Sequence, residues 1–133
     1  MDTNVLYAAL RSRAGASFAI LDALERGRWS LLLSQTVLTE YEEVLHREST
    51  ALGLDRSRIG RLLDDFCALA ELHRTSNQWT SLLSDPADEA FVQLAAEARS
   101  DYLISHNCRH LAPAATCGVR VIAPRDFLSI LAP

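Results

Sequence analysis

Residues 101–111, DYLISHNCRHL, concentrate side chains that can bind metals. His106, Cys108 and His110 alternate with other residues, and zinc prefers such nitrogen and sulfur ligands. A structural zinc site needs four ligands, normally from two separated pairs, and the other cysteines and histidines show no such pairing. In a helix, Cys108 would also point away from the face shared by the two histidines. We therefore interpret this segment as something other than a zinc site.

Three acids and one amide form a second candidate group: Asp2, Glu40, Asp88 and Asn107. Each also has a plain structural interpretation. Asp2 and Asp88 can cap helices, while Glu40, next to other glutamates, can lie on a solvated helix face. Asn107 can end a strand in a turn. If the acids share one pocket, their like charges raise one another's pKa values, and a cation that prefers oxygen ligands removes this repulsion.

These side chains require a scaffold, and the sequence predicts one from alternating helices and strands. Short apolar runs predict strands at residues 29–34, 101–105 and 118–123, whereas residues 74–88 are rich in turn formers. Helical spacing of apolar residues predicts helices over residues 3–12, 16–29, 34–50, 55–73, 87–100 and 124–132. The predicted helix boundaries are Ser17 and Gly27 for the second helix, Ser34 and Asp55 as N-caps, Asp88 near a helix start, and Pro124 in a first turn.

This order predicts an α/β fold, with a central parallel sheet flanked by helices on both faces. The length of 133 residues and the lack of a linker predict one domain over residues 1–133. In such sheets, functional side chains gather at the carboxyl ends of the strands. The candidate acids are expected at that edge.

Composition excludes several classes of protein. No apolar run is long enough to span a bilayer and no signal peptide is recognisable, so we expect a cytoplasmic protein without a membrane partner. Three scattered cysteines predict reduced thiols. A net charge of −4 argues against a broad nucleic-acid-binding surface but allows a local basic patch. A receiver-like signalling domain would need a late lysine, and the chain contains none.

Four segments together resemble the PIN-domain family of metal-dependent ribonucleases, particularly its bacterial VapC-like toxin branch. They are MDTNVLYAAL at the start, LSQTVLTEYEEVL, DPADEAFVQLAAEARSDYLISHNCRHL, and GVRVIAPRDFL near the end. The resemblance covers essentially the whole chain. It implies a single PIN-like domain that hydrolyses RNA phosphodiester bonds with Mg²⁺ or Mn²⁺.

The resemblance also implies roles for individual residues. By position, Asp2, Glu40 and Asp88 are the metal ligands, and Asn107 occupies a fourth catalytic slot that often holds an acid. The remaining implied roles are phosphate contacts for Arg109 and His110, and support of the metal ligands by Thr3, Asn4 and Ser34. Each of these also has a surface or helix-capping alternative. The implied partners are RNA, a small antitoxin protein and a second copy of the chain in a homodimer.

The chain departs from this family at two places. Relatives carry a strand of about five apolar residues immediately before the first aspartate, a normal strand length, whereas only Met1 precedes Asp2 here. Either the start codon was assigned too late or the protein lacks this strand, and the first strand is expected to be truncated. Asn107 also removes one negative charge from the pocket. These departures favour, as the alternative function, a weakly active or inactive PIN-like module that binds RNA or a partner protein.

Overall fold

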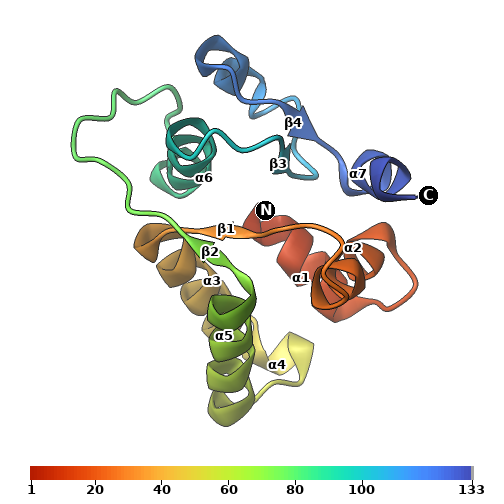
Figure 1. The fold of residues 1–133 in the computed structure, drawn as a ribbon. Helices are drawn as coiled ribbons and strands as arrows, with labels where there is room; N and C mark the ends of the chain where they lie inside the picture. The colour runs from red at the N-terminus through yellow and green to blue at the C-terminus, as the bar shows by residue number, and fades with distance from the viewer. Residues whose placement is uncertain (133) are drawn as a thin grey trace.

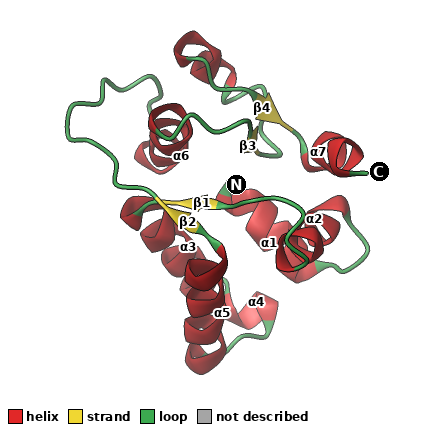
Figure 2. Cartoon of the chain, in the orientation of Figure 1, coloured by secondary structure: helices red, strands yellow, loops and turns green. Residues whose placement is uncertain are grey.

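The computed structural model describes residues 1–132. Its helices are α1 (Thr3–Arg11), α2 (Ala16–Glu25), α3 (Gln35–Arg47), α4 (Ser49–Leu52), α5 (Arg56–Leu69), α6 (Pro86–Glu97) and α7 (Pro124–Leu131), with a 3-10 helix η1 (Ala112–Cys117). The strands are β1 (Leu32–Leu33), β2 (Glu71–Leu72), β3 (Leu103–Ile104) and β4 (Val121–Ile122). Figure 2 shows that helices dominate the fold and that the strands are short. No helix within residues 1–132 combines the length and the apolar character needed to cross a membrane.

The four strands form two separate parallel pairs. β1 pairs with β2, with Leu32 opposite Glu71, and β3 pairs with β4, with Leu103 opposite Val121. The expected single central sheet is thus replaced, within the described residues, by two parallel pairs in an α/β arrangement. Figure 1 shows the N-terminus lying between the two pairs.

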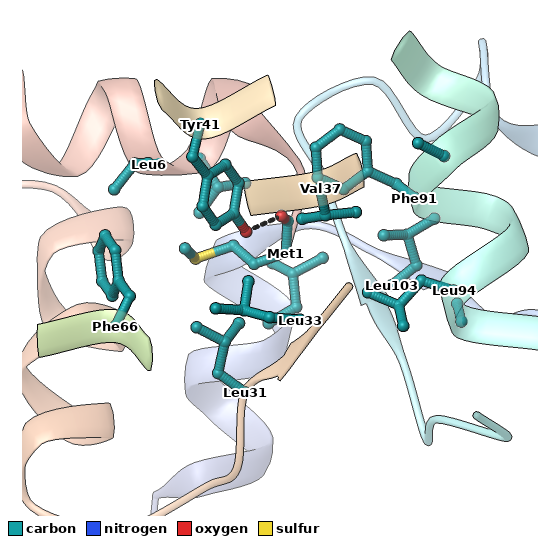
Figure 3. Packing of buried hydrophobic residues seen from close by; sticks show 14 of the residues in the cluster. Met1, Leu6, Leu31, Leu33, Val37, Tyr41, Phe66, Phe91, Leu94 and Leu103 are labelled. Atoms are coloured by element: carbon teal, nitrogen blue, oxygen red, sulfur yellow. Dashed lines mark hydrogen bonds between the residues drawn. The ribbon is translucent and has the colours of Figure 1, made fainter. Parts of the chain in front are cut away.

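The first two residues continue the pairing pattern of a strand. The Asp2 N–H donates to the carbonyl of Ile104 in β3 at 2.8 Å. The buried Tyr41 hydroxyl donates to the Met1 carbonyl, as Figure 3 shows. Met1 and Asp2 therefore lie beside β3, with Asp2 joined to it by one backbone hydrogen bond.

The core is a single apolar cluster around these strands. Leu33, Val37 and Tyr41 are fully buried, and the Tyr41 ring packs near Phe66 and Phe91, with centroids about 6 Å away. Figure 3 shows Met1 inside this cluster. Helix α3 contacts α1, α5 and α6, so one helix links the segments that carry the candidate acids.

Some predicted boundaries agree with the structure and others differ: the predicted helix 16–29 ends at Glu25, with Gly15 and not Ser17 as its N-cap, and each predicted strand is shortened to two residues. Ser34 and Asp55 cap α3 and α5 as predicted. The predicted helix 34–50 is interrupted at Glu48, and the predicted helix 55–73 ends at Leu69, because residues 71–72 pair with β1 instead. The N-cap of α6 is Asp85, not Asp88: the Asp85 carboxylate accepts from the Ala87 N–H at 2.9 Å.

Candidate active site at the carboxyl ends of the strands

Asp2 is the most firmly held of the candidate acids. Only 5% of the residue is exposed, and both carboxylate oxygens accept a hydrogen bond. The Thr3 N–H donates to one oxygen at 2.7 Å, and the Ser105 hydroxyl donates to the other at 2.6 Å. Asp2 is also the N-cap of α1. The helix-cap interpretation is therefore confirmed, and it is compatible with a role in a site.

Ser105 connects Asp2 to two other candidates, and sequence reasoning did not identify it. This residue is fully buried, and its hydroxyl accepts from the Asn107 N–H at 3.0 Å and lies 3.5 Å from the Asn4 amide nitrogen. The Asn4 amide oxygen in turn accepts from the His106 N–H at 3.3 Å. Ser105 therefore ties the start of α1 to the end of β3, and places the backbone of Asn107 beside Asp2.

Asp88 lies in the first turn of α6 and faces the same region. Its carboxylate is 3.1 Å from His110 Nε2, and its side chain is about one-fifth exposed. Burial and the nearby carboxylates of Asp2 and Asp85 raise the pKa of Asp88, although His110 partly opposes them. Ionised Asp88 thus has a like-charged neighbour from a segment far away in the sequence.

Glu40 lies on the partly exposed face of α3 and joins the acidic group from a third direction. Burial raises its pKa, and so do Glu43, Asp85 and Asp88, while Arg47 partly opposes them. The carboxylate of Asp88 thus lies near enough to that of Asp2, and the carboxylate of Glu40 near enough to that of Asp88, for like-charge repulsion to raise a pKa; we call Asp2, Glu40 and Asp88 with their surroundings the acidic neighbourhood. Asp85, at the rim of this neighbourhood, was not among the predicted site residues.

The donor types in this neighbourhood fit a hard divalent cation. Carboxylate oxygens are the ligands that magnesium and manganese prefer, and carboxylates that raise one another's pKa values are stabilised by positive charge. Within residues 1–132, however, no three His, Cys, Asp or Glu side chains already stand close enough to hold one ion. The structure therefore contains the donors and their shared negative charge, but not a closed coordination shell.

The three residues that raised the question of zinc have different partners. His106 Nε2 lies 3.0 Å from the hydroxyl of Ser17, a buried residue of α2, and His110 contacts Asp88. The Cys108 thiol lies 3.5 Å from the Ser105 carbonyl. Through these contacts the segment after β3, residues 105–110, is joined to α2 and to α6.

The remaining predicted residues lie around the acids with different degrees of support. Arg109 is exposed, as is His110, so both can reach a ligand. Thr3 acts on Asp2 through its backbone N–H rather than through its hydroxyl. Ser34 is buried and its hydroxyl accepts from the Val37 N–H at 3.2 Å, so its observed role is that of a helix cap.

Directly after Asp88 in α6, Glu89 contacts a different segment and has a structural role. It is 8% exposed and accepts from Trp79 Nε1 at 2.6 Å and from the Leu82 and Leu83 N–H groups at 2.8 Å. Burial alone would raise the pKa of Glu89, but these three bonds lower it below its usual range. Glu89 thereby anchors the segment before α6, which had no predicted structure.

Comparison with known proteins gave one match. A family model described as PIN domain matches residues 1–109, a span that includes every candidate acid and Asn107. The comparisons with curated proteins and with solved structures found no significant match.

Proposed function

The chain belongs to the PIN-domain family, whose members are generally nucleases, and from this premise we propose that it is a metal-dependent endoribonuclease. The observation that carries the proposal is the neighbourhood of Asp2, Glu40 and Asp88. These acids come from three separate segments, and burial together with neighbouring carboxylates raises the pKa values of Glu40 and Asp88. Such an arrangement costs stability and is typical of a functional site.

RNA phosphates carry the same charge as these acids, so the proposed reaction needs a cation between them. We assign Asp2, Glu40 and Asp88 as the residues that hold Mg²⁺ or Mn²⁺, with Asn107 as a neutral fourth group. A bound divalent ion supplies Lewis acidity and positive charge beside the phosphate that is attacked. The firm hydrogen bonds from Thr3 and Ser105 keep one ligand, Asp2, in a constant position.

The residues around the acids have separate tasks in this proposal. Arg109 and His110 are exposed at the rim and bind RNA phosphates, which compensates locally for the net charge of −4. Asn4 supports Asp2 indirectly, through Ser105. These roles require a few phosphate contacts at one site and not a broad basic surface.

A finer proposal concerns the biological setting. The motifs quoted above resemble the VapC-like branch, so we propose that the nuclease is the toxin of a toxin–antitoxin pair. Its partners would be a small antitoxin protein that covers the acidic pocket and a second copy of the chain. Co-expression with the product of a neighbouring small gene should relieve growth inhibition if this proposal is right.

The test of the nuclease proposal is cleavage of a mixed-sequence RNA with magnesium, with manganese and with chelator. Glu40→Gln should reduce the rate at least tenfold, whereas Glu42→Gln, an equal loss of charge at an exposed position of the same helix, should leave it unchanged. The alternative function is a PIN-like module that binds without cutting. RNA binding with no metal-dependent cleavage would favour that alternative and count against the nuclease.

A further inference from the structure

A polar pocket lies between the connection that precedes α6 and the first turns of α3 and α6, and we call it the loop pocket. Its lining side chains come from Thr36 of α3, from residues 76–84, and from the face of α6 that carries Pro86, Ala90 and Gln93. Figure 1 shows residues 76–84 within the long connection between β2 and α6. The volume of about 390 Å³ is at the small end of the range for small-molecule sites, about 300–1,000 Å³. The loop pocket therefore has room for one small organic group.

Hydrogen bonds to α6 hold this connection in place at both of its ends. The N–H and the hydroxyl of Ser76 each donate to the Glu97 carboxylate at 2.7 Å, and the Ser76 carbonyl accepts from Gln93 Nε2 at 2.8 Å. At the other end, Trp79 Nε1 donates to Glu89 at 2.6 Å. Because the walls of the loop pocket are already ordered, a ligand binds there without the cost of ordering a loop.

The loop pocket adjoins the acidic neighbourhood on two helices. Thr36 and Glu40 are four residues apart in α3, so their Cβ atoms are neighbours on one face, about 5–6 Å apart. In α6, Pro86 lines the pocket and lies between Asp85 and Asp88 in the sequence. A nucleotide whose phosphate lies at the acids can therefore place its base in the loop pocket.

The polar lining of the loop pocket favours a neutral ligand. Within residues 1–132, no lysine or arginine lines it, so a phosphate group would find no cation there. The Glu89 carboxylate lines the pocket but already accepts from three donors, which leaves little of it for a cation. Thr36, Ser81 and Ser84 are exposed, and their hydroxyls can both donate and accept. Gln93 uses its amide nitrogen within the protein, so its amide oxygen remains as an acceptor.

The apolar part of the lining includes an aromatic surface. Trp79 is half-buried, and the bond from its indole N–H to Glu89 holds the ring in place. Leu83 and Ala90 line the pocket as well. A nucleobase combines flat apolar faces with donors and acceptors at its edges, and proteins bind unpaired bases by stacking them on aromatic rings and hydrogen-bonding these edges. The lining therefore has the chemistry that recognises a nucleobase.

We propose that the loop pocket binds the base of an unpaired RNA nucleotide next to the phosphate that is cut. Trp79 provides the stacking surface, and the hydroxyls of Thr36, Ser81 and Ser84 contact the edge of the base, so the pocket sets a preference among bases. This proposal deepens the proposed function and rests on it, because the neighbouring acids are what identify the ligand as RNA. The base has to be unpaired, since only an unstacked base exposes its faces and edges to a protein.

The first experiment follows the indole N–H signals of the chain by NMR spectroscopy, with chelator present so that no RNA is cut. The probes are four RNA hexamers, each with one kind of base, and an abasic hexamer with the same backbone. The Trp79 signal should shift on binding, whereas the Trp29 signal should not, because the Trp29 N–H donates to the Ile20 carbonyl outside the loop pocket. The abasic hexamer should bind at least about fivefold more weakly than the preferred one, because stacking is lost.

The second experiment removes one hydroxyl from the loop pocket and keeps the shape of the side chain. Thr36→Val should weaken binding of the preferred hexamer about threefold to tenfold, the range expected for one hydrogen bond. The matched control is Thr39→Val, which should leave the affinity unchanged, because Thr39 does not line the pocket and its hydroxyl donates to the Gln35 carbonyl at 3.0 Å. Both threonines are exposed, so both variants should fold, and thermal unfolding verifies this.

The outcomes separate this proposal from the proposed nuclease activity. The loop pocket is overturned as a base site if the Trp79 signal does not move at saturating RNA, if the abasic hexamer binds as tightly as the others, or if the two threonine variants behave alike. Metal-dependent cleavage by the same protein would then still support the nuclease. Base-dependent binding that shifts Trp79 and is weakened by Thr36→Val supports the loop pocket, even if the protein never cuts RNA with added metal and the nuclease proposal fails.

Discussion

Two adjacent carboxylates in the first turn of α6, those of Asp88 and Glu89, have pKa values shifted in opposite directions. Glu89 is surrounded by donors from Trp79, Leu82 and Leu83, and its pKa falls. Asp88, one residue earlier, is near Asp2 and Asp85, and its pKa rises. The fold supplies three donors to Glu89, so this carboxylate has a structural role. Asp88 lies near other carboxylates and His110 opposes them only in part, so added positive charge should stabilise its ionised form.

The largest expected effect is the loss of stability when Glu89 is removed. Glu89→Ala leaves the half-buried indole N–H of Trp79 and two backbone N–H groups without their acceptor, which should cost about 3 kcal/mol. The matched control is Asp88→Ala in the same helical turn, which should change the free energy of unfolding by less than about 1 kcal/mol. Urea unfolding of the three proteins measures both values. Equal losses would show that the two carboxylates do not differ in the way described.

The second prediction concerns metal affinity, which should depend on Asp88 and not on Glu89. Asp88→Asn should weaken Mn²⁺ binding at least about tenfold, or 1.4 kcal/mol, because it removes a proposed ligand. Glu89→Gln should leave the affinity unchanged, since its side chain faces the segment before α6. Calorimetric titration gives both dissociation constants. Unchanged affinity in Asp88→Asn would remove Asp88 from the proposed metal site.

The third prediction uses pH, where the two carboxylates should act with opposite signs. The folded pKa of Glu89 is lowered, so its ionised form adds to the free energy of unfolding above its unfolded pKa. This added stability is lost as pH falls through the folded pKa. The folded pKa of Asp88 is raised, so its ionised form opposes folding and the metal-free protein regains stability as pH falls toward its unfolded pKa.

Unfolding free energies measured from neutral to acidic pH without metal should therefore separate the two variants. Acid destabilisation should become shallower in Glu89→Gln and steeper in Asp88→Asn, each by on the order of 1 kcal/mol. If the unfolding free energies of wild type and Asp88→Asn change with pH in parallel, the surroundings of Asp88 do not disfavour its ionised form.

The smallest expected effect comes from adding a carboxylate instead of removing one. Asn107→Asp should tighten Mn²⁺ binding a few-fold, because it adds attraction to a negative region, and should slightly destabilise the metal-free protein. Thermal midpoints with and without Mn²⁺ test this, and the mutant should gain more from the metal than wild type does. Identical gains would exclude Asn107 from the site.

The parts of the fold that sequence predicted well are those with local signals. Ser34 and Asp55 cap helices in the expected places because capping depends on residues within one turn. The cap at Asp85 had the same kind of signal, since it precedes a proline, which is typical of a first helical position. Assigning that start to Asp88 overlooked a readable pattern.

Other features had no local signal. Strand β2 consists of two exposed residues, Glu71 and Leu72, so no apolar pattern marks it, and only pairing with β1 makes it a strand. Ser105 is an ordinary residue in the sequence and becomes important because Asp2 lies within 2.6 Å of its hydroxyl. The partners of Glu89 come from a turn-rich segment without periodicity. Contacts of this kind depend on tertiary structure, which periodicity does not encode.

The Ser105–Asp2 hydrogen bond joins residues 103 positions apart, and this separation has a consequence for protein synthesis. At typical elongation rates, roughly 5 to 20 seconds pass between the addition of Asp2 and the addition of Ser105. During that interval the start of α1 has no β3 to hold it, and Asp2 lacks the hydrogen bond from Ser105. In the ribonuclease proposed above, this order would delay assembly of the site until most of the chain has been translated. The growing polypeptide would then stay inactive next to the largest RNA in its surroundings, the ribosome that is making it.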